Sequence, residues 1–308
     1  MIRTLRTTDL LRVLVDSRRI GPDWAQTWEK VGSQPGSALS PTAVARGLLF
    51  GREMERCNVL AEGTRLWALA SVRARSGPRA WEVHCLSLSP GAEEEGIELL
   101  ERLCVVAGDE GGERVFLRLP ASSPVVKVAR QAGFLPCLGE TLYRKEALST
   151  AHSSATRFVR PLFSSDEYGV FRLYCECVPS KVKSAYAIPF DEWRDAVEPW
   201  GNGERQGVYE AQECVRGWVR VASGKRVANR VELMVNSEEE SGAWEDMVAW
   251  GVQQGRPNAP FLALVPDYQS TLAWVLEKKG FIPTGEYQVL VKSIAVRVKD
   301  SALAPAGA

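Results

Sequence analysis

Three side chains on two similar strand-like runs could accept a proton from a substrate. Glu82 and His84 alternate along Trp81–Pro90, and Glu232 lies in the run Val231–Ser237. Alternation places Glu82 and His84 on one face of a strand. A carboxylate or an imidazole held there can take a proton from an amine, directly or through water. The competing interpretation is that these residues form the solvated face of a sheet.

Each run leads into an acidic turn and then into an apolar-striped helix. The first turn contains Glu93–Gly96, and the second contains Glu238–Ala243. The backbone N–H groups of such a turn, with the positive end of the helix dipole, form a general anion site. The carboxylates oppose that use, because two unit charges about 5 Å apart at an effective dielectric of about 20 repel by about 3 kcal/mol. Glutamates in a first helical turn also stabilise the helix without any ligand.

The strand, the turn and the helix belong to a unit that occurs twice. Gly96 stands 38 positions before Phe134, and Ala243 stands 38 positions before Phe281, so the two copies are offset by 147 positions. Each copy closes with a Gly-Phe pair, and the apolar stripe before that pair predicts a helix. A unit of this length exceeds the roughly 20 to 50 residues of solenoid repeats. The sequence therefore predicts two tandem domains.

The domain boundaries follow from composition. Small and polar residues at 148–155 predict a linker between an N-terminal domain at 1–147 and a C-terminal domain at 156–299. A disordered tail is expected at 300–308.

The overall composition predicts an ordinary water-soluble protein. The chain has 308 residues, of which 45% are hydrophobic and 25% charged, with 38 basic and 38 acidic side chains. This balance gives no electrostatic footprint for nucleic acid. No apolar run approaches the roughly 18 residues of a membrane span, and the first residues lack the apolar core of a signal peptide, so we expect a cytoplasmic location and no membrane partner. Seven cysteines without Cys-x-x-Cys spacing, and two histidines, predict no metal site.

Each half repeats one order of predicted elements. A short Arg-x-x-Arg strand, at Arg3–Arg6 and at Arg157–Arg160, precedes helical material and a meander of three antiparallel strands. A helix, a strand, a second helix, the Gly-Phe pair and a last strand follow. This order resembles the GNAT acetyltransferase superfamily, and the segment Phe171–Val182 with Phe190–Trp193 resembles tandem GNAT proteins of bacteria. The implied fold class is α/β (α+β), with two tandem GNAT-like domains, each a mixed, mostly antiparallel sheet flanked by helices.

The resemblance also implies a cosubstrate. In the superfamily, the turn after the fourth strand carries (Gln/Arg)-x-x-Gly-x-(Gly/Ala), and its N–H groups hold the diphosphate of acyl-CoA. Acetyl-CoA or another acyl-CoA is the implied cosubstrate, and a small-molecule or protein amine is the implied acceptor. We expect the sheet to open after Ser89 and after Ser237. The implied cofactor-binding residues are Leu86, Leu88, Ser89, Gly96 and Ile97 in the first copy, and Leu233, Val235, Ser241, Gly242 and Ala243 in the second.

Both copies depart from the family's turn motif. Glu93 and Glu240 stand where Gln or Arg belongs, and Glu98 and Glu245 occupy the position that the family keeps small. A carboxylate in either place weakens the binding of a phosphate. Because Gly96 retains the glycine of the motif, we expect the first copy to keep the better site.

The expected general acid is also absent. Many family members use a tyrosine four residues before the Gly of Gly-Phe, where this chain has Ala129 and Leu276. Fold resemblance alone does not decide function, so three alternatives stay open. The first is a GNAT-like N-acyltransferase that moves an acyl group from acyl-CoA to an amine. The second is a catalytically inactive tandem GNAT pseudoenzyme that acts as a scaffold or a ligand- or protein-binding module. The third is aminoacyl transfer from tRNA, against which the zero net charge argues.

Overall fold

The fold is that of a computed structural model, which describes residues 1–9, 12–13, 20–32, 57–62, 65–147, 158–200, 203–223 and 228–294. The predicted linker and tail lie outside the described residues. The first half contains β1 (Ile2–Thr4), η1 (Thr7–Asp9), β2 (Cys57–Glu62), β3 (Arg65–Ala74), β4 (Ala80–Leu88), α3 (Glu93–Asp109), β5 (Arg114–Pro120), α4 (Val125–Gln131) and β6 (Leu135–Lys145). The second half contains β7 (Val159–Pro161), η3 (Ser164–Asp166), α5 (Glu167–Cys177), α6 (Ser180–Tyr186), α7 (Phe190–Ala196), β8 (Glu204–Ala211), β9 (Cys214–Ser223), β10 (Asn229–Val235), α8 (Ser241–Gln254), β11 (Phe261–Pro266), α9 (Ser270–Lys278) and β12 (Ile282–Ser293).

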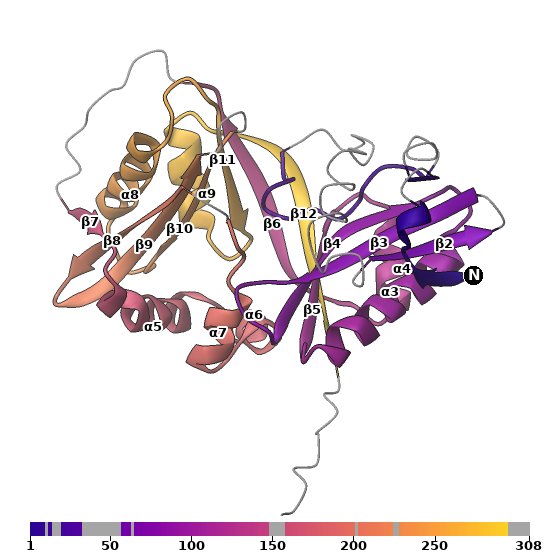
Figure 1. The fold of residues 1–308 in the computed structure, drawn as a ribbon. Coiled ribbons are helices and arrows are strands. Elements are labelled where there is room, and N and C mark those ends of the chain that lie inside the picture. The colour runs from indigo at the N-terminus through magenta and orange to yellow at the C-terminus, as the bar shows by residue number, and fades with distance from the viewer. Residues whose placement is uncertain are drawn as a thin grey trace, which may run out of the picture.

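The described strands form one sheet of twelve, in the order β1-β2-β3-β4-β5-β12-β6-β11-β10-β9-β8-β7. All neighbours are antiparallel except β4 with β5 and β10 with β11, which are parallel. Helices cover the sheet in both halves (Figure 1). The predicted fold class, a mixed and mostly antiparallel sheet flanked by helices in two similar halves, is confirmed.

The last strands of the two halves are exchanged. β6 ends the first half but pairs with β11 of the second, and β12 ends the second half but pairs with β5 of the first. β6 and β12 also pair with each other, and they cross between the two halves in Figure 1. The two half-sheets expected from the sequence therefore join into one, because either last strand has the hydrogen-bonding pattern to complete either half.

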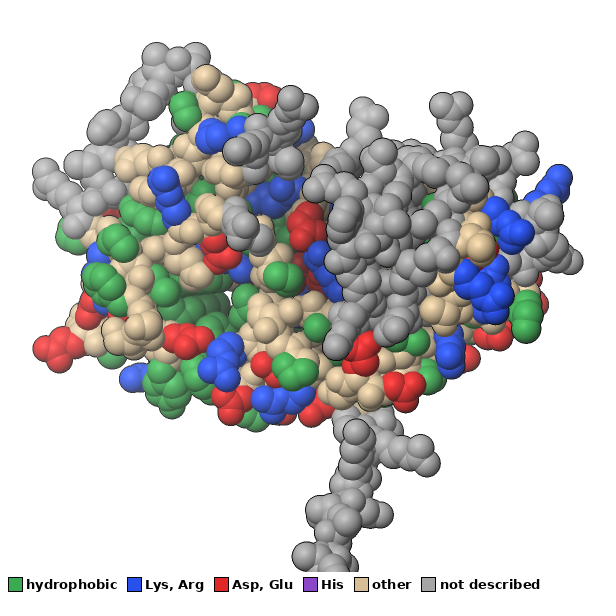
Figure 2. Space-filling view, in the orientation of Figure 1, with side chains coloured by type: hydrophobic (Ala, Val, Ile, Leu, Met, Phe, Trp, Pro, Cys, Tyr) green, Lys and Arg blue, Asp and Glu red, His purple; other side chains and the backbone are tan. Residues whose placement is uncertain are grey.

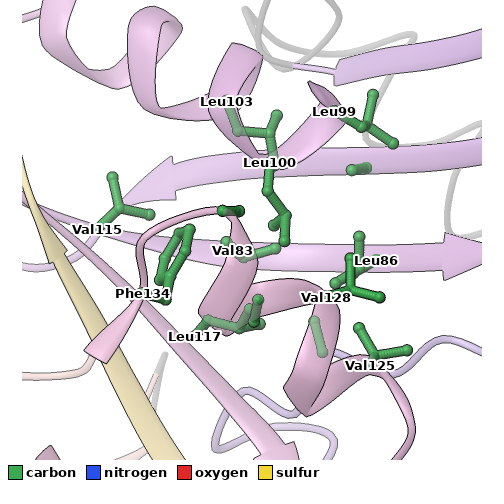
Figure 3. Close-up of a cluster of buried hydrophobic side chains, with 14 of the residues drawn as sticks. Val83, Leu86, Leu99, Leu100, Leu103, Val115, Leu117, Val125, Val128 and Phe134 are labelled. Atoms are coloured by element: carbon green, nitrogen blue, oxygen red, sulfur yellow. The ribbon is translucent and has the colours of Figure 1, made fainter. Parts of the chain in front are cut away.

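The helices and strands carry separate cores in the two halves. In the first half, α3 buries Leu99, Leu100 and Leu103 against β4, β5 and α4, as Figure 3 shows. In the second half, α8 and α9 cover one face of the sheet, and α5, α6 and α7 cover the other (Figure 1). Apolar stripes at helical spacing account for this packing, because each one buries a single helix face.

The repeated Gly-Phe pair closes the second helix of both copies in the same way. Gly133 has φ +85° and Gly280 has φ +82°. Residues other than glycine rarely adopt this backbone conformation. The N–H group of Phe134 then donates to the carbonyl of Ala129, and that of Phe281 donates to that of Leu276, each at 3.0 Å. Both phenylalanines are buried in the core of their own half. The 147-residue repeat is thus a structural repeat.

The start of each half also repeats, but in a different register from the one expected. Arg3 makes paired hydrogen bonds to Asp9 at 2.5 and 2.8 Å, and Arg160 makes the same pair to Asp166 at 2.7 and 2.9 Å. Arg160 therefore corresponds to Arg3, so the match of the two Arg-x-x-Arg segments was shifted by three residues. The equivalent residue is defined by its carboxylate partner, which the short motif does not contain.

Candidate functional site

The sheet opens in both halves where its parallel strands diverge. β4 and β5 pair only from Ala80 to Glu82, and β10 and β11 pair only from Asn229 to Val231. The openings therefore begin inside the strands, earlier than the expected points after Ser89 and Ser237. Diverging strands leave main-chain N–H and C=O groups that must find other partners.

In the first half, the chain itself fills this opening. The N–H group of Trp24 donates to the carbonyl of Leu86 at 2.8 Å, and the Leu86 N–H donates to Asp23 Oδ1 at 2.9 Å. On the other side, the Gln26 N–H donates to the carbonyl of Arg118, on β5, at 2.9 Å. Ala25 between them is fully buried in the core. Residues 23–26, which we call the inserted segment, thus bridge β4 and β5 as a strand would.

The cofactor-binding residues predicted in the first copy have roles in this packing. Leu86 bonds the inserted segment, and Leu88 lies in the core. The Ser89 N–H donates to the carbonyl of Trp67, and Ile97 packs against the same core. A Cβ on Gly96 would lie 2.8 Å from Leu88 Cδ1, so this glycine allows α3 to approach β4. These contacts explain the residues without a ligand.

In the second half, the corresponding region adjoins a cavity of about 140 Å³. It lies between the sheet and α5, α6 and α7, on the face opposite α8 and α9. Its walls are mainly apolar and aromatic, and one end is polar. Hydrophobic side chains gather in a hollow of this half, on the left of Figure 2. The polar lining residues are Arg75, Arg118, Glu140, Glu198, Arg220, Glu232, Tyr268 and Gln269.

Glu82 and Glu232 occupy equivalent positions but have different surroundings. Each pairs with an arginine directly across the sheet, Arg73 with Glu82 at 2.7 Å and Arg220 with Glu232 at 2.6 Å. Glu82 has a second guanidinium, that of Arg75, at 3.3 Å, and its side chain is only 5% exposed. The Glu232 side chain is 33% exposed and lines the cavity. Of the two carboxylates, Glu232 is the one that a ligand can reach.

His84 is not brought to the cavity. It is the extra residue of a bulge, where the pairing of β3 with β4 shifts between Cys85 and Val83. Its Nδ1 is buried without a hydrogen-bond partner. Burial, with the charges of Lys30 and Arg73, lowers the pKa of His84 to about 2. The imidazole is therefore neutral at physiological pH.

Tyr268 and Gln269 are cavity residues that the sequence reasoning missed. They follow β11, at the carboxyl end of the parallel pair, which is where sites form in such sheets. Burial, together with the nearby Glu232 carboxylate, raises the pKa of Tyr268, so its hydroxyl stays protonated. The Oε1 atom of Gln269 is buried and has no hydrogen-bond partner. Their position directly after a strand that the sequence predicted could have indicated that Tyr268 and Gln269 belong to a site.

Carboxylates in and just after the acidic turn of the second copy are paired with positively charged side chains. Arg216 pairs with Glu238 at 2.9 Å and with Glu239 at 3.0 Å. Glu245 pairs with Lys278 at 2.6 Å and Lys279 at 2.7 Å. The repulsion expected from the sequence is therefore offset at these carboxylates, whereas Glu240 is exposed.

The second copy's predicted cofactor-binding residues divide into two groups. Leu233 and Val235 lie on β10 in the core beneath α8. Ser241, Gly242 and Ala243 form the first turn of α8. A Cβ on Gly242 would meet no atom within 4 Å, so the approach to this turn is open.

A buried ionic network connects the halves beside the cavity. Arg118, on β5, binds Glu140 at 2.6 Å and Glu198, which follows α7, at 2.6 Å. Arg75 also reaches Glu198, at 3.4 Å. Burial raises the pKa of Glu140, whereas the arginines, outweighing burial, lower the pKa of Glu198 to about 2. The ring centroids of Trp28 and Trp200 lie 4.7 Å apart across the same junction.

Over the described part of the chain, no three His, Cys, Asp or Glu side chains gather as metal ligands. None of the described helices is long and apolar enough to span a bilayer.

Comparison with solved structures identifies similar folds. A GCN5-related N-acetyltransferase from Sphaerobacter thermophilus is 15% identical, with a TM-score of 0.57 and 95% of each chain covered. A putative acetyltransferase from Pyrococcus horikoshii is 12% identical, with a TM-score of 0.54, covering 96% of this chain and 90% of that one. A tandem GNAT protein from the clavulanic acid biosynthesis pathway is 13% identical, with a TM-score of 0.50, covering 92% and 93%. No family model and no curated protein matches the sequence. The chain therefore has the fold of the GNAT acetyltransferases, including a tandem one.

Proposed function

We propose that the chain is an acyl-CoA-dependent N-acyltransferase with one working site, in its C-terminal half. The observation that carries this proposal is the cavity beside the opening between β10 and β11, where Glu232 and Tyr268 both line the wall. A group that can take a proton and a group that can give one are thus held in one pocket. Amide synthesis from a thioester requires both.

The two residues fit the two proton transfers of the reaction. The amine nitrogen of the acceptor attacks the thioester carbonyl carbon, a C–N bond forms, and the C–S bond breaks. Glu232 takes the proton that the nitrogen loses, and Tyr268 gives its proton to the departing sulfur. Because the pKa of Tyr268 is raised, its hydroxyl carries a proton when the acyl-CoA binds. Tyr268 would thereby replace the acid that is missing at Leu276, which is buried.

The acyl-CoA would lie on the α8 side of the opening. The unobstructed first turn of α8 offers N–H groups and a helix dipole to the diphosphate. Lys278 and Lys279 supply positive charge near that turn, even after pairing with Glu245. The diverging strands offer main-chain partners for the two amides of the pantetheine arm, as a sheet edge does for a peptide.

The first half would be structural. Residues 23–26 already occupy the backbone of Leu86 and Arg118 in its opening, and displacing them would break several buried hydrogen bonds. Glu82 there is shielded by two arginines. We therefore assign the site to the second copy, although Gly96 had favoured the first.

The alternative is a catalytically inactive tandem GNAT scaffold or binding module. The exposed Glu240 at the position of the family's Gln or Arg favours it, because that carboxylate repels a phosphate. Calorimetric titration with acetyl-CoA separates the alternatives. An N-acyltransferase of the proposed kind binds one acetyl-CoA per chain. Absence of binding at millimolar acetyl-CoA would support the scaffold, and two sites per chain would contradict the structural role of the first half.

A further inference from the structure

The cavity's polar end has an imbalance between hydrogen-bond donors and acceptors. Gln269 Oε1 lacks a partner although its residue is only 8% exposed. Glu232, which is partly exposed, adds carboxylate oxygens at the same end. A buried acceptor left unpaired costs about 1–3 kcal/mol. A ligand that brings N–H donors would remove this cost.

The arginines that line the cavity already face carboxylates of the protein. Arg75 lies 3.3 Å from Glu82 and 3.4 Å from Glu198, and Arg220 lies 2.6 Å from Glu232. Arg118 directs its N–H groups at Glu140, Glu198 and the carbonyl of Gln26, with five bonds in all for its five hydrogens. The Tyr174 hydroxyl donates to the carbonyl of Ala187 at 3.1 Å. The Trp218 Nε1–H donates to Gln206 at 2.8 Å. A substrate carboxylate would therefore compete with these existing ion pairs.

The rest of the wall is apolar and aromatic. It includes Tyr174, Val178, Val182, Trp193 and Met234, from α5 through β10. Aromatic rings bind apolar groups and also attract a cation over their faces. Burying an unpaired carboxylate against such a wall is costly. The wall and the acceptors together select a positively charged or neutral amine and reject an acid.

We propose that the acceptor of this site is a compact primary amine with an apolar or aromatic body and no carboxylate. This inference rests on the proposed N-acyltransferase function. The amine nitrogen lies between Glu232 and Gln269 Oε1, and the body lies against the aromatic wall. The cavity of about 140 Å³ has room for a compact ligand body.

Binding of three related compounds to the full chain tests this selectivity. We would titrate 2-phenylethylamine, L-phenylalanine and 3-phenylpropionate, with and without acetyl-CoA, and follow calorimetric heat. The amine is expected to bind at least about 10-fold more tightly than either compound that carries a carboxylate, since one unpaired buried group is worth about that factor. Equal or tighter binding of L-phenylalanine would overturn the inference, as would absence of amine binding at millimolar concentration.

A variant series locates the amine nitrogen. Gln269→Met removes the orphan acceptor and should weaken 2-phenylethylamine binding about 10-fold. Gln269→Glu keeps an acceptor and should preserve or strengthen binding. Gln131→Met, on an exposed site of α4, is the matched control and should leave binding unchanged. Circular dichroism verifies that each variant is folded. Unchanged affinity in Gln269→Met, or weaker binding in Gln269→Glu, would refute the assignment.

Transfer assays distinguish failure of this inference from failure of the proposed function. If the amine binds selectively but acetyl-CoA is not consumed, the cavity chemistry is right and the acyltransferase function is wrong. If acetyl-CoA acylates amino acids as readily as 2-phenylethylamine, the function holds and the inference about the acceptor is wrong. Selective acetylation of the amine, detected by mass spectrometry, is the expected result.

Discussion

Replacing Asp23 by alanine tests whether the inserted segment is held as a strand of the first half. Asp23 Oδ1 accepts from the N–H groups of Leu86 at 2.9 Å and Ala25 at 3.1 Å, and Oδ2 accepts from Lys30 at 2.5 Å. The substitution removes these bonds and leaves the Leu86 N–H buried without its partner. Leaving such a donor unpaired costs about 1–3 kcal/mol, and loss of the charged lysine contact adds about 1 kcal/mol, so we expect a loss of about 2–4 kcal/mol.

Urea unfolding, followed by circular dichroism, measures this loss. Asp23→Asn keeps the acceptor Oδ1 and should lose less than half as much as Asp23→Ala. Asp191→Ala is the matched control, because its side chain is 62% exposed and its pair with Arg194 spans 3.4 Å; it should change stability by no more than about 0.5 kcal/mol. If Asp23→Ala were no more destabilising than Asp191→Ala, the inserted segment would not be a structural part of the sheet.

Three further outcomes are expected. The pKa of Glu198 is about 2 in the folded protein, against an ordinary 4.5, so the stability that its ionised carboxylate contributes is present above pH 4.5 and is lost as the pH falls toward 2. In urea titrations, the free energy of unfolding of the wild type should fall by about 3 kcal/mol more over this window than that of Glu198→Gln. Equal decreases in the two proteins would contradict the ionic network. Glu240→Gln should tighten acetyl-CoA binding several-fold by calorimetry, whereas Glu93→Gln should not, and the opposite order would return the site to the first copy. Fragments 1–147 and 158–308 should each melt at a lower temperature alone than in a co-expressed complex, because only the complex restores the pairing of β6 with β11 and of β12 with β5. Equal melting temperatures alone and in the complex would show that the exchanged pairing adds no stability.

The features that the sequence predicted are those encoded by local pattern. Gly133 and Gly280 need a positive φ, and the stripes before them bury one helix face, so both copies of the unit could be located. Glu232 was also found, because an acidic residue between the apolar residues Val231 and Leu233 is visible in the sequence. Its equivalent Glu82 has the same local pattern, and the two differ in surroundings that the pattern does not contain: the second arginine at Glu82, and the exposure of Glu232 to the cavity.

The features that escaped prediction depend on residues far apart in the chain. The exchange of β6 and β12 was hidden because the two strands are interchangeable in pattern. The inserted segment bonds Leu86 across 63 positions, with no motif to indicate it. Lys278 and Lys279 neutralise Glu245 across more than thirty positions, so the charge count of the turn alone overstated its repulsion. Tyr268 was missed because the expected acid lay on the following helix.

The most direct test of the proposed site compares Glu232→Gln with Glu82→Gln in one transfer assay. Release of free CoA from acetyl-CoA in the presence of 2-phenylethylamine measures the rate, and circular dichroism shows that both variants are folded. Loss of a general base typically lowers the rate about 100-fold or more, so Glu232→Gln should fall by at least that factor, while folded Glu82→Gln should keep the wild-type kcat. Equal rates in the two variants, or a larger loss in Glu82→Gln, would contradict a single working site in the C-terminal half.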